Sequence, residues 1–337
     1  MRIGILTSGG DCPGINATIR GVCKTAIHSY GMEVIGIHSG FKGLLDLDYE
    51  ELNKRSLTGL LTMGGTILGT SREKPYKKKQ IDSSINKPAL LAENVRKLGL
   101  DAVVCIGGNG TQKTANHMAK AGLPVIGIPK TIDNDIYGTD ICFGFQTAVS
   151  IATEAIDRLH STASAHQRVM VIEVMGHKAG WIALYSGMAG GGDVILLPER
   201  AYSMKNICNS ITTRMKRGKN YAIVVVAEGL PIDDSDKRAG EYIARQIERM
   251  TGVETRETVL GYTQRGGSPC SSDRILATRM GSHAVELIVR KEFGRMVAVS
   301  GKEITSVPLN EVAGITRLLP QNHELILQCE KMGICFG

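Results

Sequence analysis

The chain has 337 residues, of which 42% are hydrophobic and 22% charged, so it is long enough for about two globular domains. Aromatic residues make up only 4% and glycines number 40, which argues against an aromatic nucleic-acid platform and favours many tight turns. The eight cysteines lack CxxC spacing, and no signal region or membrane-length apolar run is present. We therefore expect a reduced cytoplasmic protein that binds neither nucleic acid nor a membrane, with a net charge of +7 that suits anionic small molecules.

Short apolar runs alternate with helix-length amphipathic segments along the whole chain. The runs predict strands at 3–7, 33–38, 101–107, 124–128, 168–174, 221–229 and 257–261. The segments between them predict helices at 16–30, 87–98, 111–121, 145–162, 204–217, 239–250 and 273–291. Because the strands are continuous Val/Ile runs, we expect α/β architecture with parallel sheets covered by helices. A turn-rich stretch near 144 predicts two Rossmann-like lobes with an active-site cleft between them.

Two glycine turns each stand between a predicted strand and a predicted helix. The first is TSGGDCPGIN (7–16) and the second CIGGNGTQKTA (105–115). Glycine lets the backbone approach a ligand closely, and the following helix presents free N–H groups to phosphate. Thr111 is predicted to cap the second helix and donate to phosphate. Neither turn has the Walker A or the GxGxxG spacing.

A pair of carboxylates follows the strand at 124–128, in PKTIDNDIYGTD (129–140). Asp133 and Asp135 stand two residues apart, beside a Thr and a Lys. Such a pair suits one acid that accepts a proton and another that holds Mg²⁺. A solvated Asx turn explains the local pattern equally well.

Four arginines stand in glycine-rich stretches or beside predicted strands, where they could bind phosphate in bidentate fashion. Arg72 follows GGTILGTS, Arg168 opens a strand, Arg256 precedes another, and Arg265 lies in YTQRGGSP. Taken singly, an arginine is more often a surface ion-pair partner, and this alternative fits Arg265 least, because its small neighbours leave the guanidinium free to reach a ligand. The turn at Met175 and Gly176, in EVMGHKAGW, could place its backbone next to a substrate.

Together these motifs resemble those of the 6-phosphofructokinase family, and the match covers nearly the whole chain. The shared motifs occur in the family's order: GGDCPGIN, GGTILGTSR, GGNGT, PKTIDND, the MG turn at 175–176, VVVAEG and LGYTQRGGSP. The resemblance implies transfer of the γ-phosphoryl of ATP to the 1-hydroxyl of fructose 6-phosphate in glycolysis, with Mg²⁺. It also implies a nucleotide-binding lobe over 1–144 plus about 264–312. A sugar-phosphate lobe would take 145–263 plus about 313–337.

The resemblance assigns roles to particular residues of this chain. Asp133 is expected to be the base, with Thr131, Asp135 and Arg72 as further catalytic residues, and Asn109 and Asp135 at the metal. The nucleotide phosphates are expected to contact Gly10, Arg72, Asn109, Gly110 and Thr111. The sugar phosphate is expected to contact Thr131, Asp133, Arg168, Met175, Gly176, Glu228, Arg256, Tyr262 and Arg265. In the family the equivalents of Arg168 and Arg256 come from a neighbouring subunit, so a homo-oligomer, a tetramer or at least a dimer, is implied.

Four positions depart from the family's common pattern. Asn109 replaces a carboxylate associated with the metal, His177 an arginine, Tyr262 a histidine, and Lys130 a glycine. Lys130 matches the branch that contains both ATP-using and diphosphate-using members. Gly110 favours ATP, because diphosphate users carry Asp there and a carboxylate would repel the nucleotide's α-phosphate.

Several functions stay open at this point. Arg20, Lys24 and Lys54 resemble parts of a nucleotide-effector site, to which Lys216, Arg217 and Lys219 could add charge, as in an allosteric enzyme; solvated surface is an equal alternative. A diphosphate-dependent enzyme and a non-catalytic nucleotide or sugar-phosphate sensor are the main alternatives. A dinucleotide-dependent oxidoreductase lacks its GxGxxG, and a kinase of NAD or of lipids would not need QRGGSP.

Overall fold

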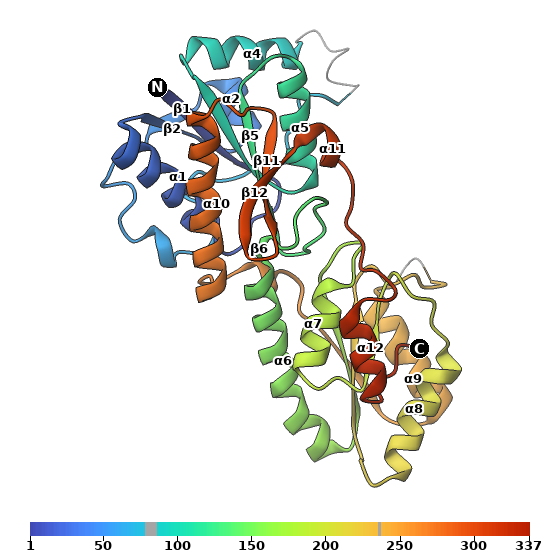
Figure 1. The fold of residues 1–337 in the computed structure, drawn as a ribbon. Helices are drawn as coiled ribbons and strands as arrows, with labels where there is room; N and C mark the ends of the chain where they lie inside the picture. The colour runs from blue at the N-terminus through green and yellow to red at the C-terminus, as the bar shows by residue number, and fades with distance from the viewer. Residues whose placement is uncertain (78–85, 235–236) are drawn as a thin grey trace. The chain divides into compact units, whose positions relative to one another are not determined.

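The computed structural model describes residues 1–77, 86–234 and 237–337. Within these ranges the chain forms two compact units, each assembled from three stretches of sequence. Unit 1 comprises residues 1–131, 136–146 and 265–316, and unit 2 comprises residues 132–135, 147–264 and 317–337. Helices alternate with strands through most of both units (Figure 1).

The sheet of unit 1 is largely parallel. Its strands are β1 (Arg2–Ser8), β2 (Glu33–Ile37), β3 (Tyr49–Glu51), β4 (Ala102–Gly107), β5 (Val125–Thr131), β6 (Phe143–Gly144), β11 (Arg295–Ser300) and β12 (Glu303–Pro308). They lie in the order β12-β11-β5-β4-β1-β2-β3, with β6 beside the end of β5. Only the outer strands β3 and β12 pair antiparallel among the described residues. β4 and β5 are buried along their whole length, as their continuous apolar runs predict.

Helices cover both faces of this sheet. On one face α1 (Ile15–Tyr30) and α10 (Ser271–Val289) pack together, near the short 3₁₀ helix η1 (Leu60–Thr62). On the other, a core forms from Leu6, Val103 and Cys105 of the strands with residues of α2 (Phe41–Asp46), α4 (Lys87–Lys97), α5 (Asn109–Lys120) and α11 (Leu309–Val312). Cys105 is fully buried, as its place in an apolar run predicts.

Unit 2 has a second sheet, and all of its described strand pairs are parallel. Its strands are β7 (Val169–Val174), β8 (Val194–Leu196), β9 (Ala222–Ala227) and β10 (Thr255–Val259), in the order β10-β7-β9-β8. Its helices are α6 (Phe145–His166), which starts at the end of unit 1, α7 (Trp181–Ala189), α8 (Met204–Lys216), α9 (Ala239–Thr251) and α12 (Glu324–Lys331). The predicted α/β class with parallel, helix-covered sheets is confirmed. In the described part of the chain no helix is long and apolar enough to cross a membrane.

The structure corrects one strand boundary that matters for the site. β10 spans Thr255–Val259, whereas the sequence predicted 257–261. Arg256 therefore lies inside the strand, opposite Met170 of β7, and does not precede it. The error arose because Leu260 and Gly261 extend the apolar run, although Leu260 already follows the strand and Gly261 begins the 3₁₀ helix η2 (Gly261–Arg265).

Candidate functional site

Three neighbouring parallel strands of unit 1 end at the same edge of the sheet. Ser8 at the end of β1 lies opposite Gly107 of β4, and Gly107 lies opposite Pro129 of β5. The chain leaves β1 toward β2 on one side and later returns through β4 on the other. Ligands of open α/β sheets bind at such a reversal of strand order, outside the carboxyl ends of the strands. The two glycine turns and the TIDND segment all begin at this edge.

The turn after β1 is joined to the segment that carries Arg72. The backbone N–H of Gly9 donates to the Ser71 carbonyl over 3.0 Å, and the Thr70 hydroxyl donates to the Gly9 carbonyl over 2.6 Å. Gly9 has a φ of +87°, which favours glycine. These bonds place the exposed Arg72 next to the first glycine turn.

Two cationic side chains reach the same turn at Gly10. A Cβ added to Gly10 would lie 2.5 Å from Nη1 of Arg265, and that nitrogen donates to the Asp11 carbonyl over 3.3 Å. The buried Lys130 donates from Nζ to the Gly10 carbonyl. A larger residue at this position would push the guanidinium aside, and the two cations give the turn a positive potential that suits phosphate. Gly10 and Arg265, predicted for different substrates, thus lie together in unit 1.

The second glycine turn leads into α5. The helix begins at Asn109, and its N-cap is Gly108, with no side-chain hydrogen bond at the cap. Thr111 is therefore not the cap that the sequence predicted. Its buried hydroxyl donates to the Ser8 carbonyl over 3.2 Å, which ties α5 to the end of β1. Apart from the helix's own backbone and the two neighbouring residues, no atom of the described residues lies within 4 Å of a Cβ added to Gly110, so open space faces this turn of the helix.

The TIDND segment continues from the last residue of β5, Thr131. Asp133 and Asp135 are 9% and 8% exposed, and Asn134 between them has a φ of +53°, a left-handed conformation that Asn adopts more readily than most non-glycine residues. The Asp135 carbonyl accepts a hydrogen bond from the Arg317 backbone N–H over 2.7 Å. The segment is therefore built to hold two nearly buried carboxylates in a fixed conformation.

The expected magnesium site has a small donor set. Among the described residues, no group of three or more His, Cys, Asp or Glu side chains could hold a metal ion. Of the two residues expected at the metal, Asn109 of unit 1 offers an amide oxygen and Asp135 of unit 2 a carboxylate oxygen. These hard donors fit Mg²⁺, which commonly takes one or two protein ligands together with water and substrate phosphates.

In unit 2, further predicted residues follow the carboxyl ends of neighbouring strands. Met175 and Gly176 follow β7, Glu228 follows β9, and Tyr262 follows β10 with 77% of its surface exposed. Oε1 of Glu228 accepts from the N–H of Gly176 over 3.2 Å and of His177 over 2.7 Å. This carboxylate therefore fixes the Met-Gly turn, beside a cavity of about 570 Å³ that it lines with His177 and other side chains.

Sequence reasoning missed Gln264 at this edge. The residue is fully buried, its Oε1 accepts from the Met175 N–H over 3.3 Å, and its Nε2 donates to the Gly261 carbonyl over 3.2 Å. It thereby joins the turn that carries Tyr262 to the Met-Gly turn. The available signal was its position in QRGGSP, where an uncharged amide stands directly before Arg265.

Arg168 and Arg256 lie at the amino ends of the strands of the same sheet, away from the carboxyl ends that Met175, Gly176 and Glu228 follow. Arg168 immediately precedes β7 and Arg256 is the second residue of β10, and these two strands pair in parallel with Val169 opposite Thr255. From Arg168 to Met175 the extended chain covers about 23 Å. Within one copy the two arginines therefore come together with each other, but not with Met175, Gly176 or Glu228.

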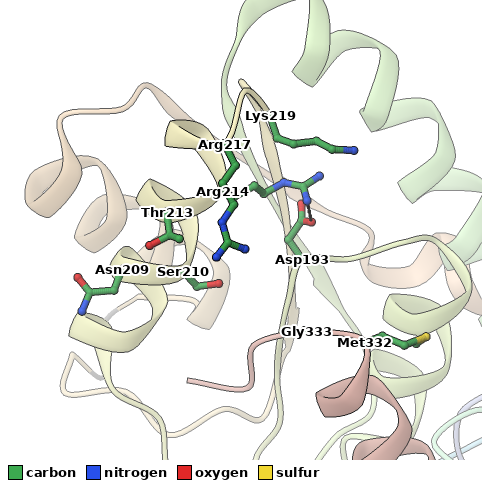
Figure 2. Close-up of a pocket in the computed structure, with 9 residues that line it drawn as sticks. All are labelled: Asp193, Asn209, Ser210, Thr213, Arg214, Arg217, Lys219, Met332 and Gly333. Atoms are coloured by element: carbon green, nitrogen blue, oxygen red, sulfur yellow. Dashed lines mark ion pairs between the residues drawn. The ribbon is translucent and has the colours of Figure 1, made fainter.

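A separate basic pocket of unit 2 lies beside α8 (Figure 2). Arg214, Arg217 and Lys219 line it, and Nη1 of Arg214 forms an ion pair with Asp193 over 2.7 Å. Three cations around one carboxylate suit an anionic ligand. Arg217 and Lys219 were expected to add charge to an effector site, whereas Lys216 is not among the lining residues. That this chain is regulated by an effector stays a prediction.

The comparison with known sequences places these features in one family. The family model described as phosphofructokinase matches residues 2–288. An "ATP-dependent 6-phosphofructokinase 3" of Bacteroides thetaiotaomicron is 68% identical over 337 residues, covering all of both chains. An "ATP-dependent 6-phosphofructokinase" of Spirochaeta thermophila is 54% identical, covering 99% of this chain and 97% of the relative.

Solved structures agree with the sequence comparison. A phosphofructokinase of Pichia pastoris in the T-state superposes with a TM-score of 0.85 at 32% identity over 93% of this chain, which spans only 35% of the Pichia chain. A pyrophosphate-dependent phosphofructokinase of Nitrosospira multiformis has a TM-score of 0.87 at 23% identity, over 100% of this chain and 92% of the other, and shows the shared fold alone. On the family model and the relatives together, this chain belongs to the phosphofructokinase family.

Proposed function

We propose that this protein transfers the γ-phosphoryl group of ATP to the 1-hydroxyl of fructose 6-phosphate, giving fructose 1,6-bisphosphate and ADP. The observation that carries this proposal is the meeting of Gly10, Lys130 and Arg265 at the switch point of the unit 1 sheet. A glycine turn approached by two cations, beside the N-terminus of α5, is suited to a chain of phosphates. Unit 1 is thus the nucleotide-binding part and unit 2 the sugar-phosphate-binding part.

The assignment of ATP as donor rests on Gly110. The open space at its Cα leaves room for the nucleotide's α-phosphate, and a carboxylate in that place would repel it. Relatives at 68% and 54% identity carry ATP-dependent names. The fold itself does not separate the donors, because a pyrophosphate-dependent enzyme shares it.

The roles of the TIDND residues follow from phosphoryl-transfer chemistry. Asp133 accepts the proton of the 1-hydroxyl as its oxygen attacks the γ-phosphorus, while Thr131 and Asp135 orient the reacting groups. Arg72 and Lys130 supply positive charge for the phosphates. Asn109 and Asp135 would hold Mg²⁺, which, when bound, neutralises phosphate charge. The nearly complete burial of Asp133 keeps its carboxylate in place and limits competition by water.

The sugar phosphate binds through residues of two copies of the chain. Met175, Gly176, Glu228 and Tyr262 of one copy surround the sugar, and Arg168 and Arg256 of another bind its phosphate. The separation of these sets by the length of a strand supports this arrangement, since a hexose phosphate is too short to contact both edges of one sheet. The protein is accordingly a homo-oligomer, a tetramer in the form we favour, and acts in the cytoplasm.

A donor assay tests the proposal. The protein is supplied with fructose 6-phosphate and Mg²⁺, together with either ATP or diphosphate, and fructose 1,6-bisphosphate is measured. We expect turnover with ATP only. In the Gly110→Asp variant we expect kcat/KM for ATP to fall by about a hundredfold or more, because the new carboxylate meets the α-phosphate, while fructose 6-phosphate still binds.

The matched control is Gly110→Ala, which adds only a methyl group in open space. Turnover of wild-type protein with diphosphate alone would overturn the donor assignment. Binding of both substrates without turnover by either donor would favour a sensor. Equal loss of ATP binding and sugar-phosphate binding in Gly110→Asp would mean that this residue does not contribute selectively to nucleotide binding.

A further inference from the structure

Glu254 stands between the two arginines that the proposed function assigns to the sugar phosphate. Oε2 of Glu254 accepts from Nε of Arg168 over 2.7 Å, and Oε1 accepts from Nη2 of Arg256. The backbone holds this arrangement in register, because the Glu254 carbonyl accepts from the Val169 N–H over 3.0 Å as β7 and β10 begin to pair. One carboxylate thus bonds two guanidinium groups at the starts of two adjacent strands.

We infer that Glu254 is an internal counter-ion that occupies the phosphate-binding arginines in the absence of sugar phosphate and competes with it. The two oxygens of a carboxylate and the oxygens of a phosphate make the same charge-assisted bonds to guanidinium groups. A phosphate monoester arriving at Arg168 and Arg256 must either displace Glu254 or bind next to its negative charge. Both routes weaken binding, so Glu254 sets the affinity for fructose 6-phosphate. This inference rests on the proposed role of the two arginines.

The accessibility of the cluster supports exchange between the two anions. The side chains of Arg168, Glu254 and Arg256 are 29%, 39% and 51% exposed, so a solvent-borne phosphate can reach them. The hydrogen bond from Arg168, more than any other contact, lowers the pKa of the Glu254 carboxyl, which therefore stays charged at neutral pH. Ion pairs this exposed contribute little to folding stability, so removing the charge should affect binding much more than folding.

The test is the variant Glu254→Gln in the full-length protein. The amide oxygen still accepts a hydrogen bond from Arg168, but the negative charge is gone. We expect the KM for fructose 6-phosphate to fall about three- to tenfold, with kcat and the KM for ATP unchanged within about twofold. The melting temperature of the free protein should change little. A matched control is Glu257→Gln, which removes the same charge three residues further along, within β10, at a residue whose side chain points to the opposite sheet face from Arg256.

Two results would overturn the inference. If Glu254→Gln leaves the KM for fructose 6-phosphate unchanged, or lowers it no more than Glu257→Gln does, the carboxylate does not compete. If the KM rises, Glu254 aligns the arginines and does not oppose the phosphate.

The variant Arg168→Gln separates this inference from the proposed function. We expect it to raise the KM for fructose 6-phosphate and not that for ATP. If it raises neither, the assignment of Arg168 fails whatever Glu254 does. If it raises the sugar-phosphate KM while Glu254→Gln has no effect, only the counter-ion inference fails.

Discussion

Tyr76 connects the segment that carries Arg72 to the helix that carries Gly110 and Thr111. Its ring stacks on His117 of α5, with ring centroids 5.0 Å apart and an interplanar angle of 14°. Burial, more than the nearby lysines, lowers the pKa of His117, so the stacked imidazole is neutral at neutral pH. The Tyr76 hydroxyl is buried without a hydrogen-bond partner in the described part of the chain. Its ring, and not its hydroxyl, therefore holds the segment in place.

Replacement of Tyr76 tests this positioning role. We expect Tyr76→Ala to raise the KM for ATP by about fivefold or more, because Arg72 loses its anchor four residues away. It should also lower the free energy of unfolding by about 2 kcal/mol through loss of the stack and its packing. Tyr76→Phe should keep wild-type kinetics and at least wild-type stability, since it removes an unpaired buried hydroxyl.

Steady-state kinetics with ATP and fructose 6-phosphate varied in turn, and urea unfolding, give the necessary measurements. A loss in Tyr76→Phe as large as that in Tyr76→Ala would show that the hydroxyl has a partner. An unchanged KM for ATP in Tyr76→Ala would remove the stack from the positioning of Arg72.

At the scale of elements, the contact between α1 and α10 brings two site turns together. α1 follows the first glycine turn and α10 follows QRGGSP. Their backbones meet at two glycines: a Cβ added to Gly21 would lie 2.7 Å from the Thr278 carbonyl oxygen, and one added to Gly281 2.6 Å from that of Thr18. Because each turn leads into one of these two helices, their close approach helps to hold the Arg265 guanidinium next to the turn at Gly10.

Gly281→Ala should therefore disturb both folding and nucleotide binding. Alanine ordinarily stabilises a helix relative to glycine, but here its methyl group meets backbone atoms that cannot move aside. We expect the free energy of unfolding to fall by about 1–3 kcal/mol and the KM for ATP to rise. Ser29→Ala on the exposed side of α1 is the control. If Gly281→Ala were as stable as wild type, the helices would not be in backbone contact.

The elements that were predicted from the sequence are those whose pattern of burial produces a clear pattern of apolar residues. Fully buried strands such as β4 and β5 were predicted because both faces are apolar, and α1, α5 and α10 were predicted from their periodicity. α7 was missed because it is apolar nearly all round, so its sequence shows no amphipathic period. β11 and β12 were missed because their pairing is decided by long-range contacts with β5 and with each other.

The site was predictable as a set of motifs but not as a set of contacts. The glycine turns and the TIDND segment could be recognised from their residue types and from their position directly after predicted strands. Lys130 was noted beside the carboxylates and as a departure from the family pattern, but its bond to the Gly10 carbonyl depends on β1 and β5 ending at the same edge of the sheet. The role of Glu254 could not be predicted from the sequence, because its contacts with the two arginines depend on the register between β7 and β10.

At the scale of the whole molecule, the two edges of the unit 2 sheet carry two halves of one expected binding site. Arg168 and Arg256 lie at the amino edge, and Met175, Gly176 and Glu228 follow the carboxyl edge. Parallel pairing fixes this separation, since side chains at opposite ends of a strand cannot converge. If both sets bind one sugar phosphate, as we propose, a second copy of the chain has to supply the half that the first copy cannot.

Co-expression of two inactive variants tests this requirement. Asp133→Ala lacks the base and Arg168→Ala lacks a phosphate ligand, so each alone should have little activity at low fructose 6-phosphate. In a mixed oligomer, a site that takes Asp133 from one variant and Arg168 from the other is intact, and random assembly makes about one site in four of this kind. We expect the co-expressed protein to recover activity toward that fraction of wild type, whereas the separately purified proteins, mixed without exchange of subunits, stay inactive. Activity that remains at the level of the single variants in a verified mixed oligomer would mean that Arg168 and Asp133 of the same copy serve one site, and the two-copy arrangement would fail.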